Sequence, residues 1–246
     1  MCESGAISLG DMINVCVPTG NFGNIFACYI AKLMGLPVCK LVCASNVNNV
    51  LTDFLRTGVY DRNRDFHTTI SPSMDILISS NLERLLYVTL GSEKTAAYME
   101  KLAKGGKYAL SADELKMINA SFLGYYTSEE ETKKTIKNAY EKKNCLIDTH
   151  TAVAVNAAEC YKSDYKAERK ILVVSTASPY KFANDVYIAL TGKAPSDELS
   201  ALSELSSLSG VEIPYPLANL ATKKAIHTGV IDKSEMDEDT LSFARN

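Results

Sequence analysis

The sequence lacks the features that mark several broad classes of protein. No signal peptide is apparent, because the first residues, MCESGAISLGD, have neither a basic start nor an apolar core. The longest apolar stretch, IFACYIAKLMGLPVCKLVCA, is interrupted by Lys32, Pro37 and Lys40, which argues against a membrane span. No low-complexity tract or extended basic face is present, and the net charge is −3. We therefore expect neither a membrane nor a nucleic acid as a partner.

The seven cysteines include no Cys-x-x-Cys pair. Cys28, Cys39 and Cys43 fall in apolar segments that are typical of a protein core. An odd number of scattered thiols indicates buried, reduced cysteines and argues against a disulfide framework or a zinc site. We therefore expect a cytoplasmic protein that holds no metal.

What the sequence does contain is the pattern of an α/β protein. Two short β-rich runs, at residues 12–18 and 38–45, enclose a turn and an amphipathic helix at residues 25–35. This βαβ unit predicts a parallel sheet with helices on its faces. A third apolar run, at residues 171–174, is typical of a central parallel strand. Only these three strands are convincing in a chain of 246 residues, so we expect an α/β fold whose sheet is incomplete.

The middle of the chain has helical periodicity. We expect helices in SMDILISSNLERLLYVTLG, SADELKMINASFLGYY and SEEETKKTIKNAYEKKN, the latter two opened by Ser-x-x-Glu capping boxes at Ser111 and Ser128. From Gly192 onward, serine, proline and aspartate become frequent, which predicts short helices lying on a domain. We therefore divide the chain into a main domain at residues 1–191 and a helical extension at residues 192–246.

The turn VPTGNFGN, at residues 17–24, connects the first strand to the first helix. Gly20 and Gly23 permit backbone angles that are closed to other residues, so consecutive N–H groups can converge at a helix N-terminus. This arrangement favours a bound phosphate. The turn matches neither the P-loop motif nor the dinucleotide-binding motif. The alternative is a strand-to-helix turn that is capped by Asn24 and binds nothing.

Two further groups of residues are candidates for the same site. Ser175 and Thr176 follow the third strand at its carboxyl end, where open α/β sheets bind ligands, although Thr176 alternatively caps the next helix. Asp148, His150 and Thr151 begin a helix after an apolar segment. A lone Asp-x-His motif is more often structural than catalytic, and no second histidine or cysteine completes a metal set. No motif for nucleophilic catalysis is present.

A succession of five motifs is similar to that of a known family. VPTGNFGN is followed by CASNVNNVLTDFLRTGVYDR, TTISPSMDILISSNLERLLY, DTHTAVAV and STASPYKF. Together they closely resemble the C-terminal half of threonine synthases of the microbial and fungal branch, over about residues 5–190. The resemblance implies a partial tryptophan-synthase-β-like large domain, the fold type II of pyridoxal 5'-phosphate (PLP) enzymes. It also implies the conversion of O-phospho-L-homoserine and water into L-threonine and phosphate.

The resemblance assigns roles to individual residues as well. The turn would bind the cofactor phosphate, and Thr176 would face the pyridine nitrogen with a neutral hydroxyl, which leaves the ring less electron-withdrawing than an aspartate would. The residues implied to bind the cofactor are Gly20, Asn21, Phe22, Gly23, Asn24 and Thr176. Those implied to line the site are Asp148, His150, Ser175, Asn46, Ser71 and Ser73.

The chain departs from the family pattern at one essential point. Threonine synthases carry their Schiff-base lysine in an N-terminal segment that reads like H-G-P-T followed by F-K-D, and no such segment occurs here. Lys181 is the lysine nearest to a site motif, but the family does not use it for this purpose. No catalytic residue is therefore assigned, and we expect a fragment that makes no threonine alone.

Three interpretations follow from these observations. The first is the incomplete half of a threonine synthase. The second is a non-catalytic module that binds PLP or phosphate, or one half of a split enzyme that pairs with a separate N-terminal chain. The third is an α/β domain whose turn binds nothing. In each case a half-sheet leaves an unpaired edge and an apolar face, so we expect the isolated chain to self-associate.

Overall fold

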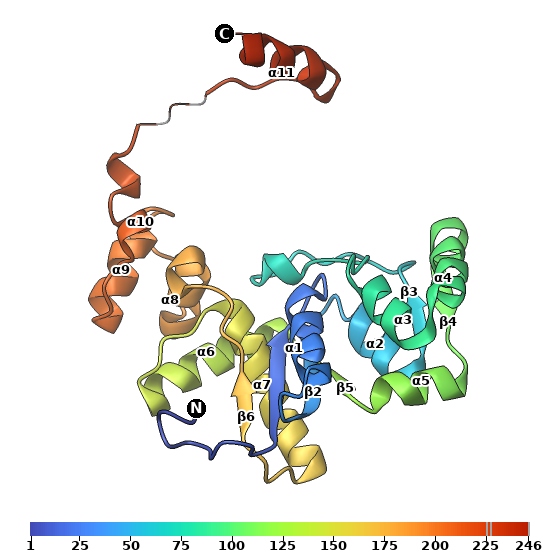
Figure 1. Cartoon of the computed structure of the whole chain (residues 1–246). Coiled ribbons are helices and arrows are strands. Elements are labelled where there is room, and N and C mark those ends of the chain that lie inside the picture. The colour runs from blue at the N-terminus through green and yellow to red at the C-terminus, as the bar shows by residue number, and fades with distance from the viewer. Residues whose placement is uncertain (225, 227, 246) are drawn as a thin grey trace. The chain divides into compact units, whose positions relative to one another are not determined.

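Figure 1 shows the computed structural model of the chain, which describes residues 1–224, 226 and 228–245. Two compact units are present, Met1–Glu212 and Ile213–Asn246, and each is described by itself. In the first unit, α8 (Ala183–Thr191) packs on α9 (Ser200–Ser209), so this unit extends beyond residue 192. The division into a main domain and an extension at that residue stays a prediction.

A four-stranded sheet lies at the centre of the first unit. Its strands, in spatial order, are β5 (Phe122–Tyr126), β2 (Val38–Ser45), β1 (Ile13–Pro18) and β6 (Ile171–Val173). Every neighbouring pair is parallel, which confirms the predicted parallel sheet. All six residues of β1 are buried, as expected of a central strand that is covered on both faces.

Helices cover both faces of the sheet because alternate strand residues point in opposite directions. These helices are α1 (Gly23–Leu33), α2 (Val50–Thr57), α6 (Glu129–Lys143) and α7 (Thr149–Tyr165). On one face, Val17 lies beside Cys43, and both belong to an apolar cluster with residues of α1 and α2. On the other face, Cys16 lies beside Val42, and both pack with residues of α7, on which α6 lies.

Residues 59–119 form a smaller layer beside the sheet. Its elements are β3 (Val59–Asp61), η1 (Pro72–Met74), α3 (Leu82–Leu90), α4 (Ser92–Gly105), β4 (Lys107–Ala109) and α5 (Ala112–Asn119), of which β3 and β4 pair antiparallel. Tyr60 and Tyr108 from these two strands stack with their ring centroids 5.4 Å apart. The Tyr60 hydroxyl accepts a hydrogen bond from the Ser79 N–H at 2.7 Å and donates one to the Leu77 carbonyl at 3.1 Å. Tyr60 therefore fixes the irregular segment that precedes α3.

Two helix starts agree with the sequence, and two helical extents do not. Ser111 and Ser128 both form reciprocal capping boxes at the starts of α5 and α6, as predicted. The helix expected to run through FLGYY ends at Asn119, because that segment pairs with β2 as strand β5. The helix expected over residues 73–91 begins only at Leu82. In both cases long-range pairing overrides local helical periodicity.

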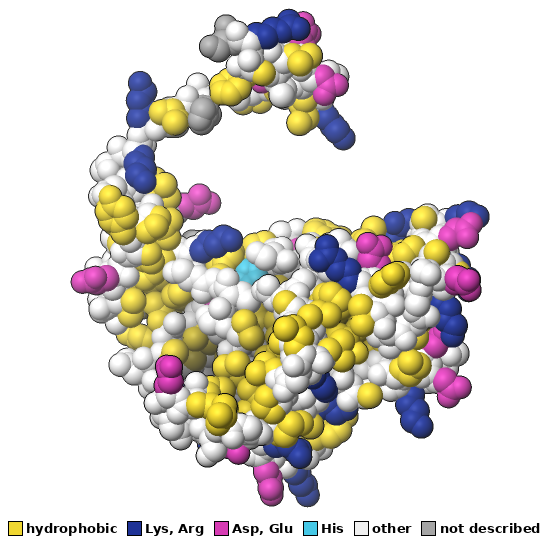
Figure 2. Space-filling view, viewed as in Figure 1, with side chains coloured by type: hydrophobic (Ala, Val, Ile, Leu, Met, Phe, Trp, Pro, Cys, Tyr) yellow, Lys and Arg dark blue, Asp and Glu magenta, His cyan; other side chains and the backbone are white. Residues whose placement is uncertain are grey.

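Both edges of the sheet are unpaired among the described residues, at β5 and at β6. β6 pairs with β1, and no strand in the described part of the chain pairs with its outer edge. Large apolar side chains are exposed at the end of α1 and on β6, among them Leu33, Met34 and Leu172. Figure 2 shows hydrophobic side chains gathered on the viewed face, over the region that α1 and β6 occupy in Figure 1. The predicted self-association has this physical basis and stays a prediction.

The second unit consists of short helices. They are α10 (Tyr215–Ala218), η3 (Leu220–Thr222), η4 (Lys233–Glu235) and α11 (Met236–Arg245). Neither α10 nor α11 buries a residue. Across the residues that the structure describes, no helix combines the length and the apolar character needed to cross a bilayer.

Candidate phosphate-binding site

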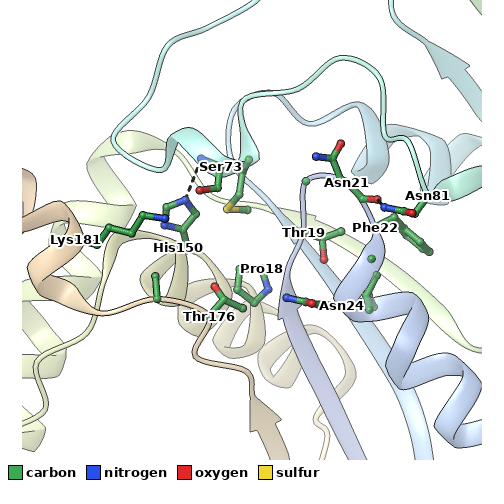
Figure 3. Close-up of a pocket in the computed structure, with 15 residues that line it drawn as sticks. Pro18, Thr19, Asn21, Phe22, Asn24, Ser73, Asn81, His150, Thr176 and Lys181 are labelled. Carbon is green, nitrogen blue, oxygen red and sulfur yellow. Dashed lines mark hydrogen bonds between the residues drawn. The ribbon is translucent and has the colours of Figure 1, made fainter. Parts of the chain in front are cut away.

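A cavity of about 320 Å³ opens where β1 and β6 end (Figure 3). These are the carboxyl ends of parallel strands, the edge at which open α/β sheets bind ligands. The walls come from the turn between β1 and α1, from η1, from the start of α7 and from the segment that leads from β6 into η2 (Pro179–Phe182). Of the residues predicted for the site, the cavity brings together Gly20, Asn21, Phe22, Gly23, Asn24, Ser73, His150 and Thr176.

The turn owes its shape to two residues. Phe22 has a left-handed backbone conformation with φ of 64°, which is unusual for a residue other than glycine. Its buried ring packs on Phe122 with the ring centroids 5.5 Å apart, and this packing holds the conformation in place. Gly20 approaches η1 so closely that a Cβ atom would lie 2.7 Å from the Ser73 carbonyl oxygen. Position 20 therefore requires glycine, because there is no space for a side chain between the turn and η1.

Hydrogen bonds from the segment before α3 hold the carbonyl groups of the turn. The buried Ser79 hydroxyl donates to the Gly20 carbonyl at 2.8 Å. The Asn21 carbonyl accepts from the Asn81 side-chain amide at 2.7 Å and from the Asn81 N–H at 3.1 Å. Since these carbonyls are bound on one side, the peptide groups of the turn have a fixed orientation.

The N–H groups of the turn are left for a ligand. Within the described part of the chain, the N–H groups of Gly20, Asn21 and Phe22 donate to no acceptor. The next residue, Gly23, begins α1, whose first N–H groups have no partner inside the helix and whose dipole adds positive potential. No side chain caps α1, so the alternative of an Asn24 cap is wrong. Backbone donors, glycine and a helix N-terminus together fit a phosphate group.

His150 forms the wall opposite the turn, and Asp148 orients it. The Nε2 atom of His150 accepts a hydrogen bond from the Ser73 N–H at 3.1 Å. In a neutral ring the proton therefore resides on Nδ1, which lies 3.2 Å from Asp148 Oδ1. Asp148 is fully buried and caps α7 by accepting from the N–H groups of His150 and Thr151. It supports the cavity from behind and does not line it.

The charge on Asp148 is stabilised by these contacts. Burial acts to raise the pKa of this carboxyl, but hydrogen bonds from His150 and Thr151 outweigh it and lower the pKa below its usual value. The Thr151 hydroxyl donates to Asp148, and its oxygen lies 3.2 Å from the Ser175 hydroxyl, from which it can accept a hydrogen bond. Asp148 therefore supports two walls of the cavity. It holds η1 through His150, which contacts Ser73, and it holds the segment after β6 through Thr151.

Ser175 and Thr176 follow β6 as predicted, but only Thr176 lines the cavity. Thr176 does not cap the next helical turn, because the Ser178 hydroxyl accepts from the Tyr180 N–H and takes that role. The alternative of a Thr176 cap is therefore wrong. The Thr176 hydroxyl is exposed and available to a ligand in the cavity.

Asn46 and Ser71 lie behind the cavity wall. Both are buried, and the Asn46 amide donates to the Ser71 hydroxyl at 3.1 Å and to Asp75 at 2.7 Å. The Thr69 hydroxyl also donates to Asp75 at 2.7 Å. This network fixes the loop that carries η1, so Asn46 and Ser71 position Ser73 without contacting the cavity.

Sequence reasoning missed Asn81 and Lys181 as lining residues. Asn81 reaches the turn across a sequence separation of 60 residues, and no local motif announces such a contact. Lys181 follows Thr176 in the same motif and lies in η2, so its proximity to the strand end was the available signal. Lys181 is the only lysine or arginine among the described residues that line the cavity, and none of these residues is acidic.

Fold and site together define an open-sheet α/β protein with a cavity suited to an anionic ligand at its strand ends. The family model for the C-terminal part of threonine synthase matches residues 151–225. Threonine synthase-like 1 of Homo sapiens is 33% identical over 241 residues, which cover 97% of this chain and 31% of that protein. Threonine synthase of Saccharomyces cerevisiae is 41% identical over 192 residues, which cover 72% of this chain and 37% of that protein.

A solved structure agrees over nearly the whole chain. The crystal structure of PLP-bound threonine synthase from Brucella melitensis superposes with a TM-score of 0.82 at 32% identity, covering 98% of this chain and 48% of that one. The chain is thus a relative of the threonine synthases that carries their C-terminal family domain, and the predicted family is confirmed. Its extent is consistent with a C-terminal portion, because it spans about a third of these curated relatives and about half of the solved structure.

Proposed function

We propose that this chain is the part of a threonine synthase that binds the phosphate of pyridoxal 5'-phosphate, and that Gly20 to Asn24 form the phosphate cradle. The observation that carries the proposal is the set of free N–H groups in the turn, fixed in orientation by Ser79 and Asn81. The PLP-bound structure from Brucella melitensis is similar over 98% of the chain and supports the same ligand. The cavity also presents no acidic side chain that would repel a phosphate.

The remaining residues of the cavity fit the rest of the cofactor. PLP, when bound, supplies an electron sink for carbanion chemistry. The Thr176 hydroxyl would donate a hydrogen bond to the ring nitrogen without requiring that nitrogen to be protonated. His150, held by Asp148 and Ser73, would form a rigid wall beside the ring. In these roles Thr176 and His150 bind and orient the cofactor.

The proposed reaction is the β,γ-replacement that converts O-phospho-L-homoserine and water into L-threonine and phosphate, a carbon–oxygen lyase reaction. This reaction needs a lysine amine and a proton-transfer base. Lys181 is the only described lysine that lines the cavity, and it does not stand in the segment that carries the Schiff-base lysine in threonine synthases. We therefore propose that the chain is inactive alone and gains activity with a separate N-terminal half. The proposed compartment is the cytoplasm, where all seven cysteines would stay unpaired.

A second candidate is a module that binds PLP or phosphate without catalysis. The free N–H groups of the turn and the lack of acidic side chains in the cavity support phosphate binding with or without catalysis. The two candidates differ in one observable: only the split enzyme makes threonine when a polypeptide with the lysine segment is added.

The test combines ligand binding with turnover. The full chain is titrated with PLP and, as a matched control, with pyridoxal, which lacks the phosphate, and the melting temperature is followed. We expect PLP to raise the melting temperature and pyridoxal to have little effect. Equal effects of the two compounds would refute the phosphate cradle.

The same preparation is assayed for threonine and then reduced with borohydride, and labelled peptides are mapped by mass. We expect no threonine and only scattered or absent labelling. Substantial threonine from the isolated chain, or a single stoichiometric lysine adduct, would show a self-contained active site and contradict the proposal.

A further inference from the structure

A second cavity, of about 560 Å³, lies along β5 at the edge of the sheet. Since β5 and β6 are the two outer strands, this cavity is on the side of the sheet away from β6 (Figure 1). Its walls come from α2, β5 and the C-terminal ends of α5 and α7. None of the residues that line it also lines the cavity at the strand ends, so the two cavities are separate.

Arg56 of α2 supplies a positive charge to this edge cavity. Its Nε atom donates to the Gly124 carbonyl at 3.1 Å, and its guanidinium carbon lies 5.5 Å from the centre of the Tyr125 ring. These two contacts fix the plane of the guanidinium group. Its two Nη groups donate to no acceptor in the described part of the chain. A fixed pair of N–H groups matches a carboxylate, which it binds through two parallel hydrogen bonds.

Asp164 of α7 supplies the opposite charge. Its Oδ2 atom accepts a hydrogen bond from the Tyr125 hydroxyl at 2.9 Å. Burial raises the pKa of Tyr125, and the hydrogen bond to Asp164 raises it further, so the hydroxyl stays a donor. Asp164 Oδ1 has no partner among the described residues, and Asp164 forms no ion pair with Arg56 or another of them. Two opposite charges therefore lie around one ring without neutralising each other.

A third polar group in the wall also lacks a partner. The Oδ1 atom of Asn119, the last residue of α5, is buried and accepts no hydrogen bond from a described residue. Buried acceptors are normally paired, and an ammonium group is a suitable donor for this one. The other walls include apolar surface from the buried Leu55, the half-buried Leu123 and the exposed ring of Tyr165.

We propose that the edge cavity binds a free α-amino acid with an apolar side chain. Its carboxylate pairs with Arg56, its ammonium group pairs with Asp164, and its side chain lies against Leu123 and Tyr165. An α-amino acid carries both charges on one carbon, whereas a peptide terminus, a simple anion or a simple amine would satisfy only one of the two protein groups. This site is distinct from the phosphate cradle, and the inference does not depend on the proposed function.

The test measures the binding of three related compounds to the full chain by calorimetry. L-Leucine carries both charges, L-leucinamide lacks the carboxylate, and 4-methylpentanoate lacks the ammonium group. We expect L-leucine to bind at least about tenfold more tightly than either analogue, because each analogue loses one charge-assisted contact. PLP is left out of this experiment, because its aldehyde would react with the amines.

Substitutions should remove the two preferences one at a time. Arg56→Met should abolish the preference for L-leucine over L-leucinamide, and Arg56→Lys, which keeps the charge without the planar fork, should retain only part of it. Asp164→Asn should abolish the preference for L-leucine over 4-methylpentanoate, while its amide oxygen can still accept from Tyr125. The matched controls are Arg84→Met and Asp65→Asn, at exposed residues outside the cavity, which should behave like the wild type.

A nuclear magnetic resonance readout locates the bound compound. We expect L-leucine to shift the methyl signals of Leu123, which lines the edge cavity, and to leave the amide signal of Gly23 in the turn unchanged. Equal or absent binding of the three compounds to the wild type overturns the inference. So does a preference that survives in the matching variant, or binding of L-leucine that leaves Leu123 unshifted. A chain that fails to bind PLP refutes the phosphate cradle alone, because L-leucine is measured without PLP.

Discussion

The turn after β1 and the segment after β6 leave neighbouring strands at the same edge of the sheet, yet they offer a ligand opposite kinds of groups. The turn offers backbone N–H groups, and its carbonyls are held by Ser79 and Asn81. The segment after β6 offers the exposed side chains of Thr176 and Lys181. Backbone N–H groups point in a useful direction only while the packing around the turn fixes the main chain. Exposed side-chain donors can be replaced without disturbing the main chain. Substitutions around the turn should therefore alter both the stability of the fold and ligand binding, whereas substitutions after β6 should alter mainly ligand binding.

The largest effect is expected from Gly20→Ala, which breaks the turn. The new Cβ would lie 2.7 Å from the backbone oxygen of Ser73, and backbone cannot move aside as a flexible side chain can. We expect a loss of about 1–3 kcal/mol in unfolding free energy and the loss of measurable PLP binding. Urea unfolding and PLP titration check both.

The control for Gly20→Ala is Gly105→Ala near the end of α4, where an added Cβ meets nothing within 4 Å. That variant should be as stable as the wild type or slightly more so, and should bind PLP normally. Normal PLP affinity in Gly20→Ala would mean that the turn is not held against η1 as described.

The next largest effect is expected from a substitution of Asp148, which supports both η1 and the segment after β6. Asp148→Asn keeps an oxygen that can cap α7 but removes the charge that holds His150 and Thr151. Hydrogen bonds to a charged group contribute about 1.5–3 kcal/mol, so we expect a loss of that order at pH 7. Unfolding by urea measures it.

The pH dependence of this loss has a definite sign. The pKa of Asp148 is lower in the folded than in the unfolded chain, so its contribution is complete above the usual aspartate pKa of about 3.9. The contribution disappears as the pH falls through the lower folded pKa. The difference in stability between wild type and Asp148→Asn should therefore shrink below about pH 4. A difference that stays constant down to pH 3 or so would contradict a stabilised carboxylate.

The local sequence was sufficient to predict those elements whose structure is determined within one short segment. The glycines and asparagines of VPTGNFGN predicted the turn, and apolar runs predicted β1, β2 and β6. The capping boxes predicted the starts of α5 and α6. In each case the physical cause, a backbone conformation or a side chain three residues away, lies within the segment itself.

Local sequence failed where a segment is defined by distant partners. β5 contains Gly124, which packs so closely on α2 that a Cβ would lie 2.8 Å from the Thr52 Cα, and this contact has no local sign. The segment before α3 has helical periodicity but is drawn into an irregular path, because Ser79 and Asn81 bind the turn and Tyr60 binds Ser79. Lys181 was noted in the sequence, but its place in the cavity depends on how η2 folds back.

A smaller effect is expected from Ser79→Ala, which loosens the turn without crowding it. The variant leaves the buried Gly20 carbonyl without its donor, which costs about 1–3 kcal/mol, while Asn81 still holds Asn21. We expect PLP affinity to fall about tenfold or less, with the fold retained. Ser80→Ala, at the exposed neighbouring residue, should change neither quantity. Equal behaviour of the two alanine variants would remove Ser79 from the support of the turn.

The smallest effect on stability is expected from Thr176→Val, which tests the other region. The side chain is exposed and caps no helix, so the unfolding free energy should change by less than about 0.5 kcal/mol. If the hydroxyl faces the pyridine nitrogen, the variant should bind PLP only a few times more weakly, because the turn still holds the phosphate. The absorption spectrum of bound PLP should shift, and Thr176→Ser should restore it. An unchanged spectrum in Thr176→Val would place the hydroxyl away from the ring, and a large loss of stability would mean that the segment after β6 is as tightly constrained as the turn.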